Sequence, residues 1–126
     1  MRTSTLTSRI AIAFAAIVAV FGLTLSLSGC SQNVDMSTVT AIIDVRTPDE
    51  FASGHVEGAV NINWEGATFA DEVASLDKSG TYLLYCRSGN RAGQAKAAME
   101  QMGFTDVTNL GGYQDAANAT GLPLVP

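Results

Sequence analysis

Residues 81–91 read Thr-Tyr-Leu-Leu-Tyr-Cys-Arg-Ser-Gly-Asn-Arg. The apolar run 81–85 predicts a buried strand. Residues 90–102 place alanines and methionines at helical spacing, and Gly103 follows, which predicts a helix and its end. The short polar segment Cys86–Arg91 links the two. Strand, tight link and helix in this order favour an α/β fold.

The rest of the chain from residue 41 repeats this alternation of strand and helix patterns. Further strands are predicted at residues 41–45, 60–62 and 107–110, and further helices at 48–53, 68–76 and 112–120. The strands at 41–45 and 81–85 are almost continuously apolar, which suits strands covered on both faces. We therefore expect residues 41–126 to form one small α/β domain with a mainly parallel sheet flanked by helices.

The N-terminal region has the layout of a secretory signal peptide. Arg2 and Arg9 precede an uncharged apolar run, residues 10–25, and small residues follow just before Cys30. The run is shorter than the roughly 20 residues that a membrane-spanning helix needs. The alternative is an uncleaved membrane anchor.

The tail Leu27-Ser28-Gly29-Cys30 resembles the lipobox of bacterial lipoproteins. The resemblance implies that residues 1–29 are removed, that Cys30 carries the lipid, and that residues 30–40 are a tether. The protein would then be exported and held in the bacterial cell envelope, at the outer face of the cell membrane or in the periplasm.

Charge limits the partners of this chain. Seven basic and twelve acidic residues give a net charge of −5, which becomes −7 without Arg2 and Arg9. Such an acidic body disfavours nucleic acid and electrostatic attachment to anionic lipid, so membrane contact is expected through the lipid alone.

Cys86 is the cysteine whose role needs an explanation. If Cys30 carries a lipid, Cys86 has no partner for an internal disulfide, which leaves intermolecular pairing, a reactive thiol or a buried structural cysteine. Unpaired amides and the positive dipole end of the predicted helix, together with Arg87 and Arg91, favour a thiolate, the nucleophilic form. The same groups would hold an anionic substrate or leaving group.

These residues resemble the rhodanese family. The resemblance rests on the loop 86–91, the upstream segments 43–46, 50–51 and 54–62, the paired glycines 111–112 and the segment 121–123. It implies a single small rhodanese-like domain that acts as a thiosulfate sulfurtransferase. Cys86 would attack the outer sulfur of a thiosulfate-type donor, release sulfite, and pass the sulfur from a persulfide to cyanide or a thiol. No metal or organic cofactor is implied. Substrate binding falls to Arg87, Ser88, Gly89, Asn90 and Arg91.

Other polar and aromatic residues have more than one interpretation. Asp44 and Arg46 follow a predicted strand, so they provide either an orienting hydrogen bond to the loop or a structural ion pair. For His55, the only histidine, a structural hydrogen bond in the Gly-His turn is favoured over a general base. Trp64 and Phe69 are expected to pack in the core. The family's frequent tryptophan after the paired glycines is missing here, and so are an extra strand and helix before residue 41.

Two alternative functions follow from the same loop. Protein phosphatases and arsenate reductases also carry a cysteine loop before a helix, but typically with five residues between cysteine and arginine; Cys86 and Arg91 enclose four. A persulfide carrier or binding module without turnover would have the same sequence. The physiological donor and acceptor and the oligomeric state are left open.

Overall fold

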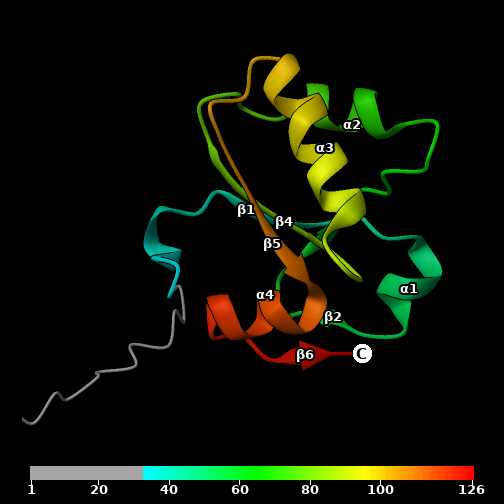
Figure 1. Cartoon of the computed structure of the whole chain (residues 1–126), viewed down its shortest axis with the longest axis vertical. Coiled ribbons are helices and arrows are strands. Elements are labelled where there is room, and N and C mark those ends of the chain that lie inside the picture. Colours follow the sequence, from blue (N-terminus) through cyan, green and yellow to red (C-terminus); the bar gives the residue numbers. More distant parts are fainter. Residues whose placement is uncertain (1–32) are drawn as a thin grey trace, which may run out of the picture.

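The computed structural model describes residues 33–126, and its centre is a four-stranded sheet. The strands are β1 (Ala41–Asp44), β3 (Val60–Asn61), β4 (Thr81–Cys86) and β5 (Asp106–Gly112). They lie in the order β3-β1-β4-β5, and every neighbouring pair is parallel (Figure 1). The predicted parallel sheet and its strands are confirmed.

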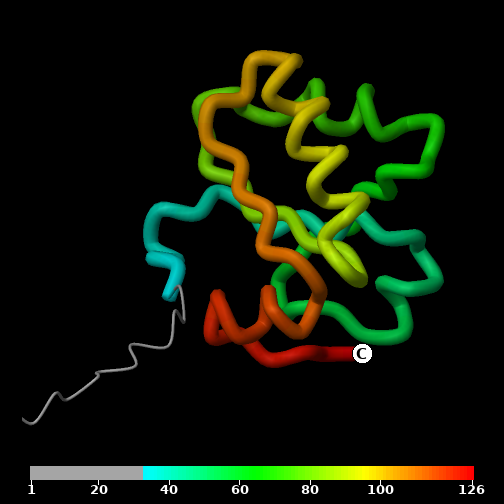
Figure 2. Tube along the Cα trace, viewed as in Figure 1, coloured from blue at the N-terminus to red at the C-terminus, as the bar shows by residue number. Residues whose placement is uncertain are grey.

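Helices cover both faces of this sheet. They are α1 (Pro48–Ala52), α2 (Phe69–Ala74), α3 (Asn90–Gln101) and α4 (Tyr113–Thr120), each at a predicted position. Tyr82 and Leu84 of β4 belong to the core cluster on the side of α2 and α3, whereas Leu83 and Tyr85 belong to the cluster on the side of α4. This alternation buries both faces of the strand. In Figure 2, β4 runs between the layer that contains α2 and α3 and the layer that contains α4.

A second, two-stranded sheet was not predicted from the sequence. β2 (His55–Val56) pairs antiparallel with β6 (Leu124–Val125) near the C-terminal end of the chain. Each strand has two residues, too few to give a periodic signal, and the partners lie far apart in sequence. The pairing ties the C-terminal segment to the turn after α1.

The domain begins earlier than the predicted tether allows. A 3-10 helix spans Met36–Thr38, and the Val34 amide donates a hydrogen bond of 3.0 Å to the Ala119 carbonyl. Val34, Met36 and Val39 pack against the core cluster beside α4. The expectation that residues up to 40 form a free tether is therefore wrong for this part, because three apolar side chains find a partner in the fold.

The predicted signal peptide and the lipidated Cys30 lie outside the described residues. Within residues 33–126, no helix has the length and hydropathy needed to cross a membrane.

Strand order brings the functional loop to a favourable position. β1 and β4 are neighbours, with Asp44 opposite Tyr85, yet the chain continues from β1 toward β3 and from β4 toward β5. The carboxyl ends of such strands border a crevice where α/β proteins bind ligands. Cys86 and Arg46 both lie at this edge.

Candidate active site

Cys86 ends β4 and immediately precedes the loop to α3. Its side chain is fully buried, and its Sγ accepts a hydrogen bond of 2.9 Å from the Gly89 amide. Gly89 has φ +93°, a left-handed conformation that turns its N–H back toward the sulfur and that favours glycine. The loop therefore directs a backbone donor at the thiol, at the N-terminus of a twelve-residue helix.

The paired glycines let β5 approach this loop closely. A methyl group on Gly112 would lie 2.6 Å from the Arg87 carbonyl oxygen, and one on Gly89 would lie 3.1 Å from the Gly111 Cα. The two backbone segments are thus in direct contact, and side chains at these positions would separate them.

Asn109 fixes this contact, and sequence reasoning missed it. Its side-chain amide donates to the Gly89 carbonyl at 2.9 Å, while its Oδ1 accepts from the Gly111 amide at 2.9 Å. One side chain thus joins the cysteine loop to the glycine pair. An asparagine near the carboxyl end of a parallel strand was the signal that could have indicated this role.

Arg91 forms an ion pair with α1. Its guanidinium donates to both carboxylate oxygens of Glu50, at 2.7 and 3.0 Å, and lies 3.5 Å from the Glu65 carboxylate. The hydrogen bond from Arg91 lowers the pKa of Glu50 to about 2, helped by donors on Thr47 and opposed by partial burial. The pKa of Arg91 is raised, mainly by the same hydrogen bond. Glu50, which the sequence analysis did not assign to the site, thus forms an ion pair with the guanidinium that was expected to bind substrate.

Arg87 is placed differently from Arg91. It is exposed and lines a pocket beside the loop, and within residues 33–126 no carboxylate forms an ion pair with it. Ser88 and Asn90 are also exposed, and the Asn90 Oδ1 accepts a hydrogen bond from Gln94 at 2.6 Å. Of the two predicted arginines, Arg87 is the one with an available charge.

Asp44 and Arg46 form a buried structural ion pair, one of the two interpretations of the sequence. The Arg46 Nη2 lies 2.6 Å from Asp44 Oδ2 and also 2.6 Å from the Gly54 carbonyl oxygen. Burial opposes the charge of Arg46, but its hydrogen bond and attraction to Asp44 prevail and raise its pKa. The guanidinium also lies 4.9 Å from the centre of the Tyr113 ring, a cation–π distance. The pair joins the end of β1 to the turn after α1.

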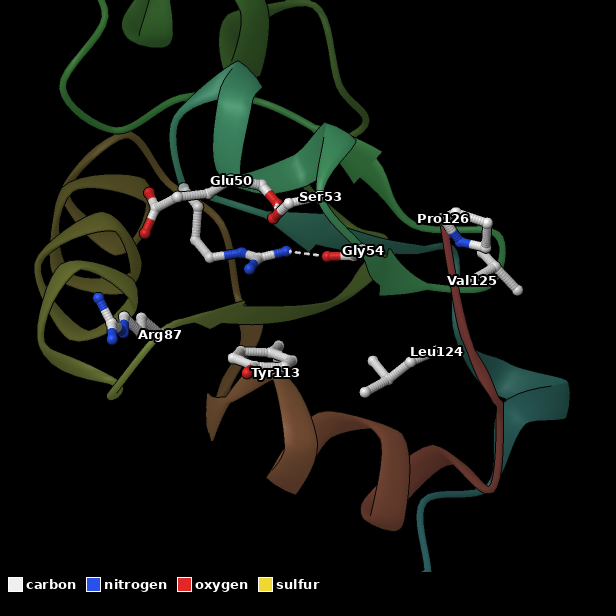
Figure 3. A pocket seen from close by; sticks show the side chains of 9 residues that line it. Glu50, Ser53, Gly54, Arg87, Tyr113, Leu124, Val125 and Pro126 are labelled. Atoms are coloured by element: carbon white, nitrogen blue, oxygen red, sulfur yellow. Dashed lines mark hydrogen bonds between the residues drawn. The ribbon is translucent and has the colours of Figure 1, made fainter.

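The pocket beside the loop has a volume of about 510 Å³. It is lined by Arg46, Glu50, Ser53, Gly54, Arg87, Tyr113, Leu124, Val125 and Pro126. In Figure 3, Arg87 lies at one end, Leu124 lies toward the other, and the Tyr113 ring lies between them. Tyr113, directly after the paired glycines, supplies the aromatic ring of this pocket.

The remaining candidates have structural contacts. The His55 Nδ1 is 2.9 Å from the Phe51 carbonyl oxygen, and its ring stacks on Phe51 with centroids 3.7 Å apart. Trp64 and Phe69 meet edge to face at 4.9 Å, and both pack in the core on the α3 side. The structural interpretation of His55 and the core placement of the two aromatic residues agree with this arrangement. Among residues 33–126, no group of three or more His, Cys, Asp or Glu side chains could hold a metal.

These features define a class of site: a thiol at the carboxyl end of a parallel strand, contacted by a loop amide at a helix start, with an arginine at an adjoining pocket. Such sites carry out nucleophilic group transfer through cysteine. The chain belongs to the rhodanese-like domain family, whose model matches residues 28–119.

Named relatives and a solved structure agree with this assignment. The thiosulfate sulfurtransferase PspE of Escherichia coli (strain K12) is 41% identical over 75 residues, which cover 60% of this chain and 72% of PspE. The thiosulfate sulfurtransferase GlpE of Pseudomonas aeruginosa is 35% identical over 74 residues, covering 58% of this chain and 66% of GlpE. A structure of a rhodanese with anions from E. coli shares 38% identity with a TM-score of 0.57, covering 68% of this chain and 95% of that one.

Proposed function

We propose that this protein moves sulfane sulfur from thiosulfate to a nucleophilic acceptor through a persulfide on Cys86. The observation that carries the proposal is the Gly89 amide 2.9 Å from the buried Sγ, at the start of α3. A donor and a positive helix end stabilise negative charge on sulfur, which favours the nucleophilic thiolate. The names of PspE and GlpE support thiosulfate as the donor.

In the first half-reaction, the Cys86 thiolate attacks the outer sulfur of thiosulfate. A new S–S bond forms, the bond to the inner sulfur breaks, and sulfite leaves with the electron pair. Arg87, exposed beside the loop, is the group that would hold the sulfonate. Cys86 has no exposed surface, so the loop has to open enough for a terminal sulfur atom to reach Sγ.

In the second half-reaction, cyanide or a thiolate attacks the outer sulfur of the persulfide and regenerates the Cys86 thiolate. No electrons are gained or lost overall. The ion pair between Arg91 and Glu50 serves to hold α1 against the start of α3, so we assign Arg91 a positioning role and Arg87 the contact with the donor.

Sulfite release from thiosulfate tests the proposal. We expect Cys86→Ser to lose at least about 100-fold in rate, because removing a covalent nucleophile abolishes its route. An aryl phosphate serves as the comparison substrate. Turnover of the phosphate without sulfite release would instead identify a cysteine-loop phosphatase.

Our proposal includes export and lipid attachment at Cys30. It is supported by the basic and apolar character of residues 1–25, by the lipobox-like residues 27–30, and by a folded domain that begins close behind them. Expression of the full chain in a bacterium with and without Cys30→Ser is the test. The unchanged chain should lose residues 1–29 and incorporate a labelled fatty acid, whereas the variant should do neither; an unchanged chain without the label would contradict lipid attachment.

A further inference from the structure

The first described residues and the end of α4 share one surface of the domain. The Val34 amide donates a hydrogen bond of 3.0 Å to the Ala119 carbonyl, and the Val34 side chain packs against the same core cluster as Leu122. In Figure 1, the first cyan residues lie beside the end of α4. The two segments that meet here, residues 33–38 and 117–124, form what we call the entry face.

The entry face is almost uncharged, whereas the rest of the domain is strongly charged. Its two segments contain one charged side chain, Asp35, and the remainder of residues 33–126 contains eleven acidic and five basic side chains. Glu57 borders the face, because its amide donates to the Pro123 carbonyl at 2.9 Å. The acidic side chains that disfavour contact with anionic lipid therefore lie almost all outside this face, where charge would be costly to bury.

Apolar side chains are exposed on the same surface. Leu124 is 42% exposed, Pro123 is exposed as well, and both line a shallow hollow with the neighbouring residues 117, 118, 121 and 122. Val60, at 47%, is the other large apolar side chain so exposed within residues 33–126, and it lies on β3, outside the entry face. An apolar surface of this kind gains free energy when it contacts the boundary of a lipid bilayer.

A lipid on Cys30 would hold this surface close to the membrane. Cys30 precedes Val34 by four residues, and because an extended chain spans at most about 3.6 Å per residue, Val34 lies within about 14 Å of the lipidated residue. This reach is about half of the roughly 30 Å diameter of a small domain. The opposite surface of the domain therefore cannot face the bilayer while Val34 keeps its place in the fold.

We propose that the entry face rests on the lipid bilayer and that the cysteine loop faces the aqueous compartment. The inference rests on the lipid attachment proposed above and adds the surface that contacts the membrane. The eight residues of α4 span about 12 Å between its beginning, beside the cysteine loop, and its end at the entry face. Figure 3 likewise shows Arg87 and Leu124 toward opposite ends of the pocket. Sulfur donor and acceptor then reach Cys86 from water.

Tryptophan quenching by brominated lipid tests which surface meets the bilayer. The full chain is expressed in a bacterium, purified with its lipid, and reconstituted into vesicles of phosphatidylethanolamine and phosphatidylglycerol, with or without bromine on the acyl chains. Trp64, the only tryptophan, packs against the core on the α3 side and gives the baseline. In Leu124→Trp and Asn118→Trp, the emission that the new tryptophan adds should fall at least about twofold with brominated lipid, as for tryptophan at a membrane interface.

Val60→Trp is the matched control, since Val60 is about as exposed as Leu124 and lies outside the entry face. Its added emission should be the same with both kinds of vesicle. In protein that carries the lipid, equal quenching of Val60→Trp, or no quenching of either Leu124→Trp or Asn118→Trp, would overturn the assignment of the face and leave lipid attachment standing. A full chain that carries no lipid would refute the proposed anchor, and this inference with it.

Discussion

Replacement of Gly112 by alanine should disturb the active-site loop from a position outside it. The added methyl group would lie 2.6 Å from the Arg87 carbonyl oxygen, whereas ordinary contacts begin at 3.4 Å, so the two segments must separate by about 0.8 Å. The Arg87 carbonyl is a backbone group and the methyl group is fixed rigidly to the Gly112 Cα, so no flexible side chain can absorb the shift. The φ of Gly112 is −80°, which alanine adopts freely, so the effect is a steric one.

The displaced carbonyl belongs to the residue next to Cys86, so catalysis should fall together with stability. Overpacking of this kind costs about 1–3 kcal/mol in the free energy of unfolding. A misplacement approaching 1 Å costs up to about 100-fold in rate. We therefore expect Gly112→Ala to unfold at lower urea concentration and to release sulfite about 10- to 100-fold more slowly.

Gly121→Ala is the control for this experiment. Gly121 has φ +71° at the end of α4, with no atom within 4 Å of an added methyl group. Its replacement should cost about 1–2 kcal/mol from backbone strain and leave the rate of sulfite release unchanged. The reasoning fails if Gly112→Ala keeps the normal rate and stability, or if Gly121→Ala slows the reaction equally.

Three further changes test the site. Glu50→Gln should lower the free energy of unfolding by about 1–2 kcal/mol at pH 7, because part of the interaction with Arg91 is screened by solvent. The pKa of Glu50 is about 2 in the folded protein against an ordinary value of 4.5, so the stability difference between the two proteins should shrink as the pH falls from about 4.5 toward 2. A stability difference in urea unfolding that does not change with pH would refute this prediction. Asn109→Ala, which removes both bonds between the loop and the glycine pair, should destabilise the protein by about 1–3 kcal/mol and slow sulfite release, with unchanged unfolding as the contrary result. Arg87→Ala should raise the KM for thiosulfate at least about tenfold, with Arg87→Lys intermediate; an equal KM in steady-state assays would exclude Arg87 from donor binding.

The local patterns of the sequence predict the central sheet and its helices. The apolar run 81–85 and the helical stripe after residue 90 each lie within one short continuous segment. The sequence alone therefore predicted that Cys86 lies between a strand and a helix. The helix predicted over residues 48–53 is likewise confirmed as α1, which begins at Pro48 with Thr47 as its N-cap.

Contacts between distant segments could not be predicted in this way. Glu50 and Arg91 are 41 residues apart, and nothing in their local sequence shows that one neutralises the other. The pairing of β2 with β6 depends on where the C-terminal segment lies after α4 has packed, and Val34 and Met36 become core residues for the same reason. The pairing of β2 with β6 brings Leu124 and Val125 to the pocket beside the cysteine loop. The ion pair between Glu50 and Arg91 leaves Arg87 as the arginine of the loop whose charge is not paired with a carboxylate within residues 33–126.

The mass of the protein after treatment with thiosulfate tests the central claim most directly. The unchanged protein should gain one sulfur atom, located on the peptide that contains Cys86, and should lose it again on addition of a thiol or cyanide. Cys86→Ser should gain none. An unchanged mass in the wild-type protein, or the same gain in Cys86→Ser, would contradict a persulfide at this cysteine.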